Sequence, residues 1–122
     1  MREDERAEKR SELDEDLKYF RLVAKRRTRG SRDKSLLRRI RTGLGIPVTE
    51  IVDALGMHRS VLGRLEESEA RRTITLKALD RVAGAMGCRV VYGIVPASGE
   101  KMAEVGERRR WVKKMREQEV VD

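Results

Sequence analysis

A glycine at position 56 separates two short amphipathic patterns, and this arrangement restricts the fold more than any other feature of the chain. Apolar residues recur at helical spacing both before and after it. Glycine readily adopts a positive φ, which allows two helices to cross steeply on either side of a tight turn. We therefore expect helices over residues 47–55 and 58–65 that share a core of Ile51, Leu55, Met57, Leu62 and Leu65. Val61 of the second helix is also expected to be buried.

Two further helices are expected before this pair. An apolar stripe at positions 13, 17, 20 and 24 predicts a helix over residues 11–27, which Gly30 would end. Asp33 is the expected N-cap of a second helix, closed by Gly43 and Gly45. The buried face of this second helix would consist of Leu36, Leu37, Ile40 and Leu44.

After a polar stretch over residues 66–72, another core helix is predicted. Thr73 or Thr75 would cap it, and Gly87 would end it just after Met86. Its apolar positions repeat at helical spacing and comprise Leu76, Leu79, Val82, Ala83 and Met86. A last, highly charged helix is expected over residues 98–119, and it carries Trp111, Val112 and Met115.

Residues 89–95 change character, since β-branched and aromatic side chains dominate and Pro96 ends the run. This is the one strand signal in the sequence, so the strand would have no partner within its own chain. It would either pair with a symmetry-related copy or lie against a helix as extended chain. The first alternative predicts a dimer formed by Val90, Val91, Tyr92 and Ile94.

Composition narrows both the fold class and the partners. Aromatic residues make up only 3% of the 122 residues, so the core rests on aliphatic side chains, which favours a helical bundle. The formal charge of +8 predicts attraction to polyanions, nucleic acid first and anionic membrane second. Nine basic residues and one acid between positions 25 and 41 indicate either a phosphate-tracking arm or a solvated linker. No apolar run is long enough to span a membrane, and no signal peptide is recognisable.

The sequence resembles the lambda-repressor/Cro-like (XRE) helix-turn-helix family over about residues 35–87. Leu65-Glu66-Glu67-Ser68-Glu69 is similar to the ending of that family's recognition helix. A wider resemblance, over about residues 12–105, is to the mobile mystery protein A subgroup. It rests on Leu13-Asp14…Leu17, Ile40-Arg41…Leu44-Gly45, Leu65-Glu66…Glu69-Ala70, Thr73-Ile74-Thr75-Leu76 and Gly87-Cys88…Val91-Tyr92…Val95-Pro96.

This resemblance implies a recognition helix over residues 58–65 that enters the major groove N-terminus first. Base contacts would come from Arg59, Ser60, Gly63 and Arg64, because a guanidinium can bond guanine O6 and N7 together. The alternative for the two arginines is plain surface charge. Backbone contacts would come from Val48, Thr49, His58, Arg38, Arg41, Arg71 and Arg72. Pro47-Val48 departs from the family's Ser/Thr-Gln at the start of the preceding helix, which affects base specificity more than the fold.

Other chemistry finds little support in the sequence. His58 and Cys88 are the sole histidine and cysteine, too few for a structural zinc site, and a single cysteine suits a reducing compartment. Glu66, Glu67 and Glu69 are interpreted as helix-end and surface charges, and no catalytic constellation is recognisable. We therefore expect no enzyme, no cofactor and no metal.

The expected protein is a mainly α lambda-repressor-like bundle of five helices with one C-terminal strand and flanking terminal helices. Its segments would be an N-terminal helix and basic arm (1–32), a DNA-binding domain (33–87) and a strand with a charged helix (88–122). It would act as a cytoplasmic, nucleoid-associated, dimeric autorepressor on a pseudo-palindromic operator in double-stranded DNA. The alternative is an antitoxin-like module that restrains a Fic-domain protein, to which the resemblance points by association.

Overall fold

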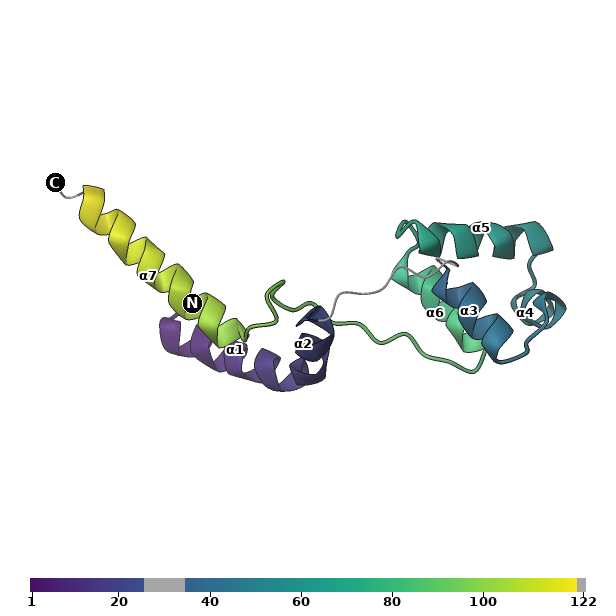
Figure 1. The fold of residues 1–122 in the computed structure, drawn as a ribbon, viewed down its shortest axis with the longest axis horizontal. Helices are drawn as coiled ribbons and strands as arrows, with labels where there is room; N and C mark the ends of the chain where they lie inside the picture. The colour runs from purple at the N-terminus through teal and green to yellow at the C-terminus, as the bar shows by residue number, and fades with distance from the viewer. Residues whose placement is uncertain (26–34, 121–122) are drawn as a thin grey trace. The chain divides into compact units, whose positions relative to one another are not determined.

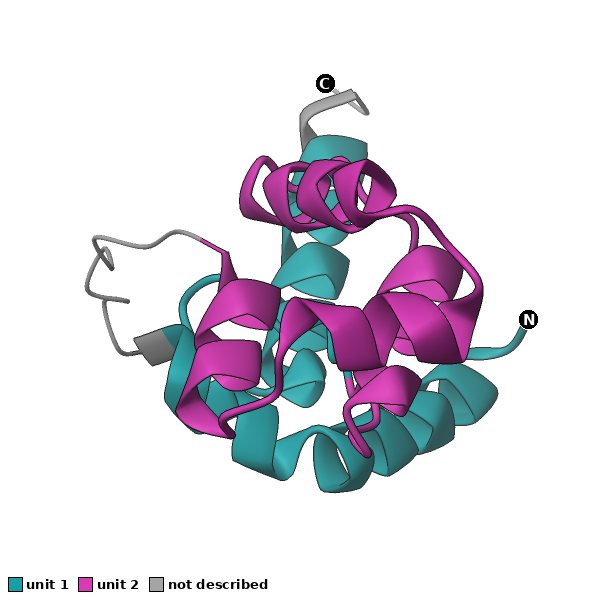
Figure 2. Cartoon of the chain, turned by 90° about the vertical axis from the view of Figure 1, so that its right-hand side faces the viewer, with its two compact units in different colours: residues 1–28, 92–122 teal, residues 29–91 magenta. Residues whose placement is uncertain are grey.

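The computed structural model describes residues 1–25 and 35–120, and every regular element in that part of the chain is an α-helix (Figure 1). The prediction of a mainly α protein is therefore confirmed. The chain divides into two compact units, which Figure 2 colours separately. Unit 1 combines residues 1–28 and 92–122, whereas unit 2 comprises residues 29–91. Both chain ends thus belong to the same unit.

Unit 2 contains four helices in its described part, where the resemblance implies five. They are α3 (Leu36–Gly43), α4 (Val48–Leu55), α5 (Arg59–Ala70) and α6 (Leu76–Ala85). The Ser35 and Thr75 hydroxyls cap α3 and α6 by accepting backbone N–H groups of Arg38 and Ala78. Asp33, the expected cap of α3, lies outside the described residues. Gly87 follows α6 with φ +72°, as its predicted role at the helix end requires.

The core of unit 2 is aliphatic and draws on all four helices. Its buried side chains are Leu37, Ile51, Leu62, Val82 and Met86, and Leu55, Met57 and Leu65 pack against them. The shared core predicted around Gly56 is therefore confirmed. The prediction was wrong for Leu36, Leu44, Val61 and Leu76, which are exposed. These short helices bury only a narrow face, so the apolar residues beside it stay in solvent.

In unit 1, the predicted helix over residues 11–27 is instead two helices. They are α1 (Glu3–Asp16) and α2 (Lys18–Lys25), with a break at Leu17, whose φ of −103° and ψ of 8° depart from helix. Arg21 stabilises the corner between them, because its guanidinium donates to the Asp14 carbonyl oxygen at 2.6 Å. No glycine or proline marks this break, which explains why the periodicity did not show it.

The last helix, α7 (Met102–Val120), starts later than predicted. The Asp14 carboxylate caps it from 88 residues away, accepting the Met102 N–H at 2.6 Å and the Ala103 N–H at 3.1 Å. A side chain of α1 thereby satisfies backbone donors that the first turn of α7 leaves without helical partners. This contact and the packing of α1 along α7 hold unit 1 together.

The structure does not support the predicted strand over residues 89–95, and its pairing with a second copy stays a prediction. Those residues form extended chain with no ladder, because a strand needs a partner and the described chain offers none. Val91, Tyr92 and Ile94 are 73%, 68% and 76% exposed. Val90 is partly buried, and its N–H donates to the Asp80 carboxylate at 3.4 Å. Strong β propensity alone therefore did not produce a sheet.

Candidate nucleic-acid interface

The segment from α4 to α5 has the predicted form of two helices joined by a tight turn. Gly56 ends α4 in the left-handed region with φ +61°, as predicted. Leu62, 2% exposed, and the partly buried Leu65 fix one face of α5 in the core. His58 caps α5 through its ring, since Nδ1 accepts the Ser60 N–H at 3.3 Å and lies 3.0 Å from the Ser60 hydroxyl. The start of α5 is therefore set both by packing and by its cap.

The opposite face of α5 carries the four residues predicted to contact bases. Arg59, Ser60, Gly63 and Arg64 are all exposed, and they follow one another at helical spacing. Neither Arg59 nor Arg64 forms an ion pair or side-chain hydrogen bond with any residue that the structure describes. A Cβ atom at Gly63 would meet nothing within 4 Å, so packing within the protein does not require a glycine there. This face is free to meet a ligand.

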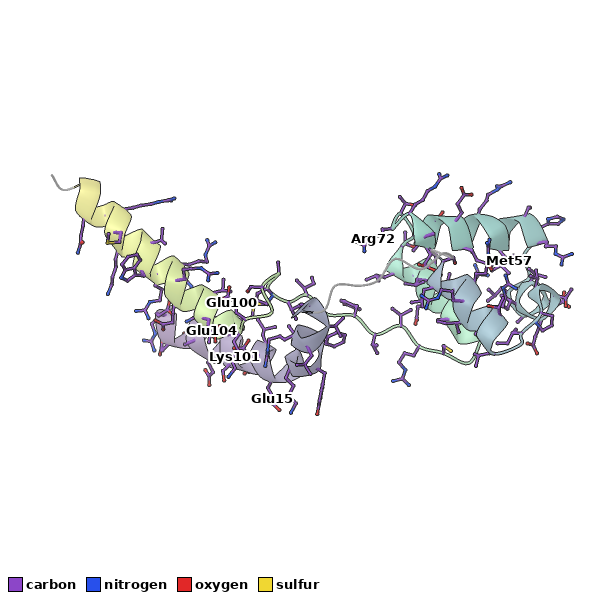
Figure 3. All side chains as sticks on the ribbon, viewed as in Figure 1. Glu15, Met57, Arg72, Glu100, Lys101 and Glu104 are labelled. Atoms are coloured by element: carbon purple, nitrogen blue, oxygen red, sulfur yellow. The ribbon has the colours of Figure 1, made fainter. Side chains whose placement is uncertain are left out.

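The residues predicted to contact the DNA backbone occupy several different environments. Thr49 and His58 are exposed, while Val48 packs against the core. Arg71 is exposed but pairs with Glu67, one helical turn earlier, at 2.6 Å. Arg72 lies at the end of α5 (Figure 3) in the left-handed region, with φ +61°.

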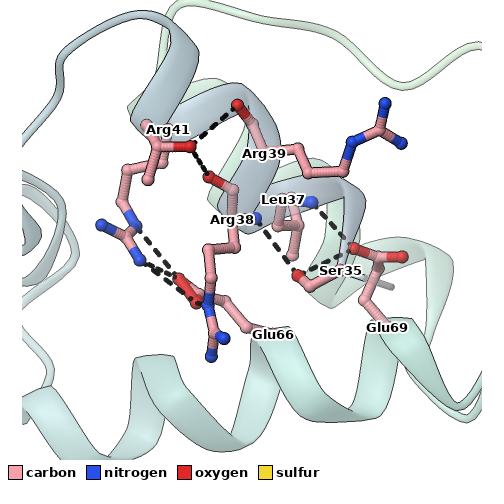
Figure 4. A network of polar contacts seen from close by, with 8 residues as sticks. Ser35, Leu37, Arg38, Arg39, Arg41, Glu66 and Glu69 are labelled. Carbon is pink, nitrogen blue, oxygen red and sulfur yellow. Dashed lines mark hydrogen bonds and ion pairs between the residues drawn. The ribbon is translucent and has the colours of Figure 1, made fainter. Parts of the chain in front are cut away.

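Arg38 and Arg41 of α3 both turn toward α5, where they meet the carboxylate of Glu66 (Figure 4). The Arg38–Glu66 distance is 3.2 Å and the Arg41–Glu66 distance is 2.9 Å. Arg38 keeps about half of its side chain in solvent, but the Arg41 side chain is only 14% exposed. The Arg41 side chain is thus committed to the contact between α3 and α5, unlike the exposed arginines of α5.

The interpretation of Glu66 as a surface charge was wrong, since this residue is 3% exposed. Glu69 is also engaged, because it accepts the Leu37 N–H at 2.8 Å and the Ser35 hydroxyl at 3.2 Å. Glu67 is exposed, as expected. The spacing carried a signal for the contacts of Glu66 and Glu69, since positions 62, 66 and 69 share one face of a helix. A carboxylate in an apolar stripe indicates a buried cationic partner.

Other site chemistry is sparse in residues 1–25 and 35–120. They contain no group of three or more potential metal ligands. None of the helices described there is both long and apolar enough to cross a membrane. Cys88 is a partly buried free thiol. No protein-family model, curated protein or solved structure matches the chain.

Proposed function

We propose that unit 2 binds double-stranded DNA sequence-specifically through the exposed face of α5, and that the protein is a transcriptional repressor of the lambda-repressor/Cro-like (XRE) type. The observation that carries this proposal is the division of α5 into two faces. Leu62 and Glu66 fix one face to the rest of the unit, while Arg59 and Arg64 project from the other without partners among the described residues. Two guanidinium groups held in this way can bond guanine edges.

Gly63 supports close approach of α5 to a ligand. Glycine within a helix costs about 1 kcal/mol relative to alanine. The space around Gly63 is open, so no contact inside the protein offsets that cost. A major-groove wall against the helix backbone would offset it, because even a methyl group at this position would limit approach.

Phosphate contacts are assigned to exposed groups at both ends of α5 and beside it. His58 caps the start of α5, Thr49 lies in the first turn of α4, and Arg71 and Arg72 follow the end of α5. Arg38 contributes the part of its guanidinium that Glu66 does not cover. A homodimer would place two copies of α5 in successive major grooves, with half-sites about 10 base pairs apart. Such a regulator would work in the cytoplasm, on the nucleoid.

The test is protection of the DNA upstream of the protein's own gene, comparing wild type with Arg59→Ala/Arg64→Ala. The matched control is Lys101→Ala/Lys114→Ala, which removes the same formal charge from exposed positions of unit 1. We expect wild type and control to protect an inverted repeat and the α5 variant to lose that protection. Sequence-blind binding that is equal in all three proteins would refute the proposal.

Salt dependence provides a second measurement on the same samples. If about six phosphates are neutralised, log K should fall with log salt with a slope of about −5. The Arg59→Ala/Arg64→Ala variant should lose discrimination between operator and random DNA. A slope near zero with full affinity would contradict this mode of binding.

A further inference from the structure

Among the residues that the structure describes, unit 1 has no large apolar side chain that is fully buried. Every large apolar side chain that is buried in the described residues belongs to unit 2. In unit 1, Leu13, Val112 and Met115 are 43%, 40% and 42% exposed, and Trp111 is 63% exposed. Two helices that pack along each other normally bury their shared face. The apolar surface of α1 and α7 is therefore incompletely covered by this unit's own residues.

A groove of about 850 Å³ runs between α1 and α7. Leu13 lines it on the α1 side and Val105 and Val112 on the α7 side. Val105 and Val112 are seven residues apart and share one face of α7, so they form an apolar stripe along the groove. An apolar stripe between two helices is the surface that a third helix covers in a bundle.

The lining of the groove is strongly basic, and Glu3 is the one acidic residue in it. Arg10 lines it from α1, and Arg109 and Lys113 line it from α7. Lys or Arg occupies six of the nine positions from 108 to 116, and none of the nine is acidic. Arg109 and Lys113 are exposed and form no ion pair among the residues that the structure describes. Their unneutralised charge favours an acidic occupant.

Arg10 is held in place by Glu3 of α1 and Gly106 of α7. Its Nη2 atom donates to Glu3 at 2.6 Å, but its Nε atom is buried with no acceptor in the described part of the chain. Gly106 makes room for this guanidinium, because a Cβ there would lie 2.6 Å from Arg10 Cδ and Cζ. The Nε atom is thus covered by the protein itself, and the rest of the guanidinium lines the groove at a fixed position.

We infer that the groove between α1 and α7 binds an acidic amphipathic helix of a partner protein. The apolar face of that helix would lie on Leu13, Val105 and Val112, and its carboxylates would meet Arg10, Arg109 and Lys113. A second copy of this unit fits less well, since the groove would then face its own positive charge across a two-fold axis. DNA also fits less well, since phosphates gain nothing from an apolar floor. This inference does not depend on the function proposed for unit 2.

The test uses the full-length protein and a labelled synthetic peptide of about 14 residues, which as a helix spans about 21 Å. The peptide carries leucines at helical spacing and glutamates elsewhere. One control peptide replaces glutamate by lysine, and a second has the acidic composition with the leucines scrambled off one face. Anisotropy of the labelled peptide measures its affinity for the protein.

We expect saturable binding of the acidic amphipathic peptide and of neither control peptide. Arg109→Glu/Lys113→Glu and Val112→Ser should each weaken it at least tenfold. The control Lys77→Glu/Arg89→Glu changes the same charge on exposed positions of unit 2 and should leave peptide affinity unchanged. Circular dichroism would verify that each variant keeps wild-type helix content.

Three results would overturn the inference. The first is the absence of saturable binding by the acidic amphipathic peptide. The second is equal affinity for the scrambled peptide, which would reduce the interaction to charge. The third is a wild-type dimer in analytical sedimentation that is lost in Val112→Ser and that the peptide does not dissociate. In that case a second copy of the chain would fill the groove. The footprint on DNA is a separate measurement, so failure here leaves the function proposed for unit 2 unaffected.

Discussion

The Arg41 guanidinium lies 2.9 Å from the carboxylate of Glu66 and joins α3 to α5 in the interior of unit 2. Replacing Glu66 by glutamine would leave Arg41 without a countercharge, in a position where its side chain is only 14% exposed. We expect Glu66→Gln to lower the free energy of unfolding by about 2 kcal/mol. Urea denaturation followed by circular dichroism measures the loss. Glu67→Gln is the control, because its exposed pair with Arg71 should contribute less than about 0.5 kcal/mol.

Gly63→Ala should separate stability from DNA binding. The added methyl group meets nothing within 4 Å, so the variant should gain about 0.5–1 kcal/mol of stability from the higher helix propensity of alanine. If α5 enters a groove closely, operator affinity should fall in the same variant. Thermal unfolding and a gel-shift titration on one preparation measure the two effects. A protein that is more stable and binds DNA with unchanged affinity would count against close approach at this position.

Gly106→Ala should have the opposite effect on stability, although alanine again replaces a helical glycine. Its Cβ would collide with the Arg10 guanidinium and force that side chain away from Glu3. We expect a net loss of about 1 kcal/mol, because the displaced pair and α1–α7 packing outweigh helix propensity. The double variant Arg10→Ala/Gly106→Ala removes the collision. It should recover the propensity gain relative to Arg10→Ala alone, measured by the same thermal unfolding.

Asp14→Ala should destabilise the start of α7 by about 1–2 kcal/mol, the usual cost of losing an N-cap. The carboxylate accepts two backbone N–H groups there and also lies 3.6 Å from Arg21. Asp14→Asn keeps an acceptor and should cost less. Hydrogen exchange at Met102 and Ala103 would locate the effect. Asp16→Ala serves as control, since Asp16 is exposed and its carboxylate has no partner in the described structure.

Acid should weaken unit 1 through carboxylates paired with cations. The hydrogen bond from Arg10 lowers the pKa of Glu3 below its ordinary 4.5, and that from Arg108 lowers the pKa of Glu100 (Figure 3). Because each pKa is lower in the folded state, the stabilisation is complete above the unfolded value and disappears as the pH falls through the folded one. We expect helix loss to begin below about pH 4.5. In a pH titration followed by circular dichroism, the helix content of Glu3→Gln/Glu100→Gln should depend less on pH than that of the wild type.

Features that depend on neighbouring residues were predictable from the sequence, whereas features that depend on residues far apart in the chain were not. The core around Ile51 and Leu62 and the turn at Gly56 were predictable, because helical period and glycine stereochemistry act within a few residues. The pairing of Glu66 with Arg41 joins positions 25 apart, so composition suggested surface charge where the fold buries an ion pair. The break at Leu17 carries no local signal. The residues around Tyr92 have strand propensity, but no neighbouring strand in the described chain provides the backbone hydrogen bonds that a sheet requires.

The candidate interface was predictable in part for the same reason. The spacing of apolar residues alone predicts that Arg59 and Arg64 lie on the exposed face of α5. Which arginines remain available does not, because Arg41 becomes committed only when α3 packs on α5. The groove in unit 1 could not be predicted, since it depends on α1 meeting a helix from the other end of the chain.

That long-range pairing also determines the order in which the protein can be completed during synthesis. The Asp14 carboxylate emerges from the ribosome 88 residues before the Met102 N–H that it caps. At about 5–20 residues per second, α1 waits roughly 5–20 s for its partner. All of unit 2 is made during that interval and can fold first. The earliest helix to be synthesised is therefore among the last to find its native contacts, and α1 spends that time as an acidic, solvent-exposed segment open to other partners.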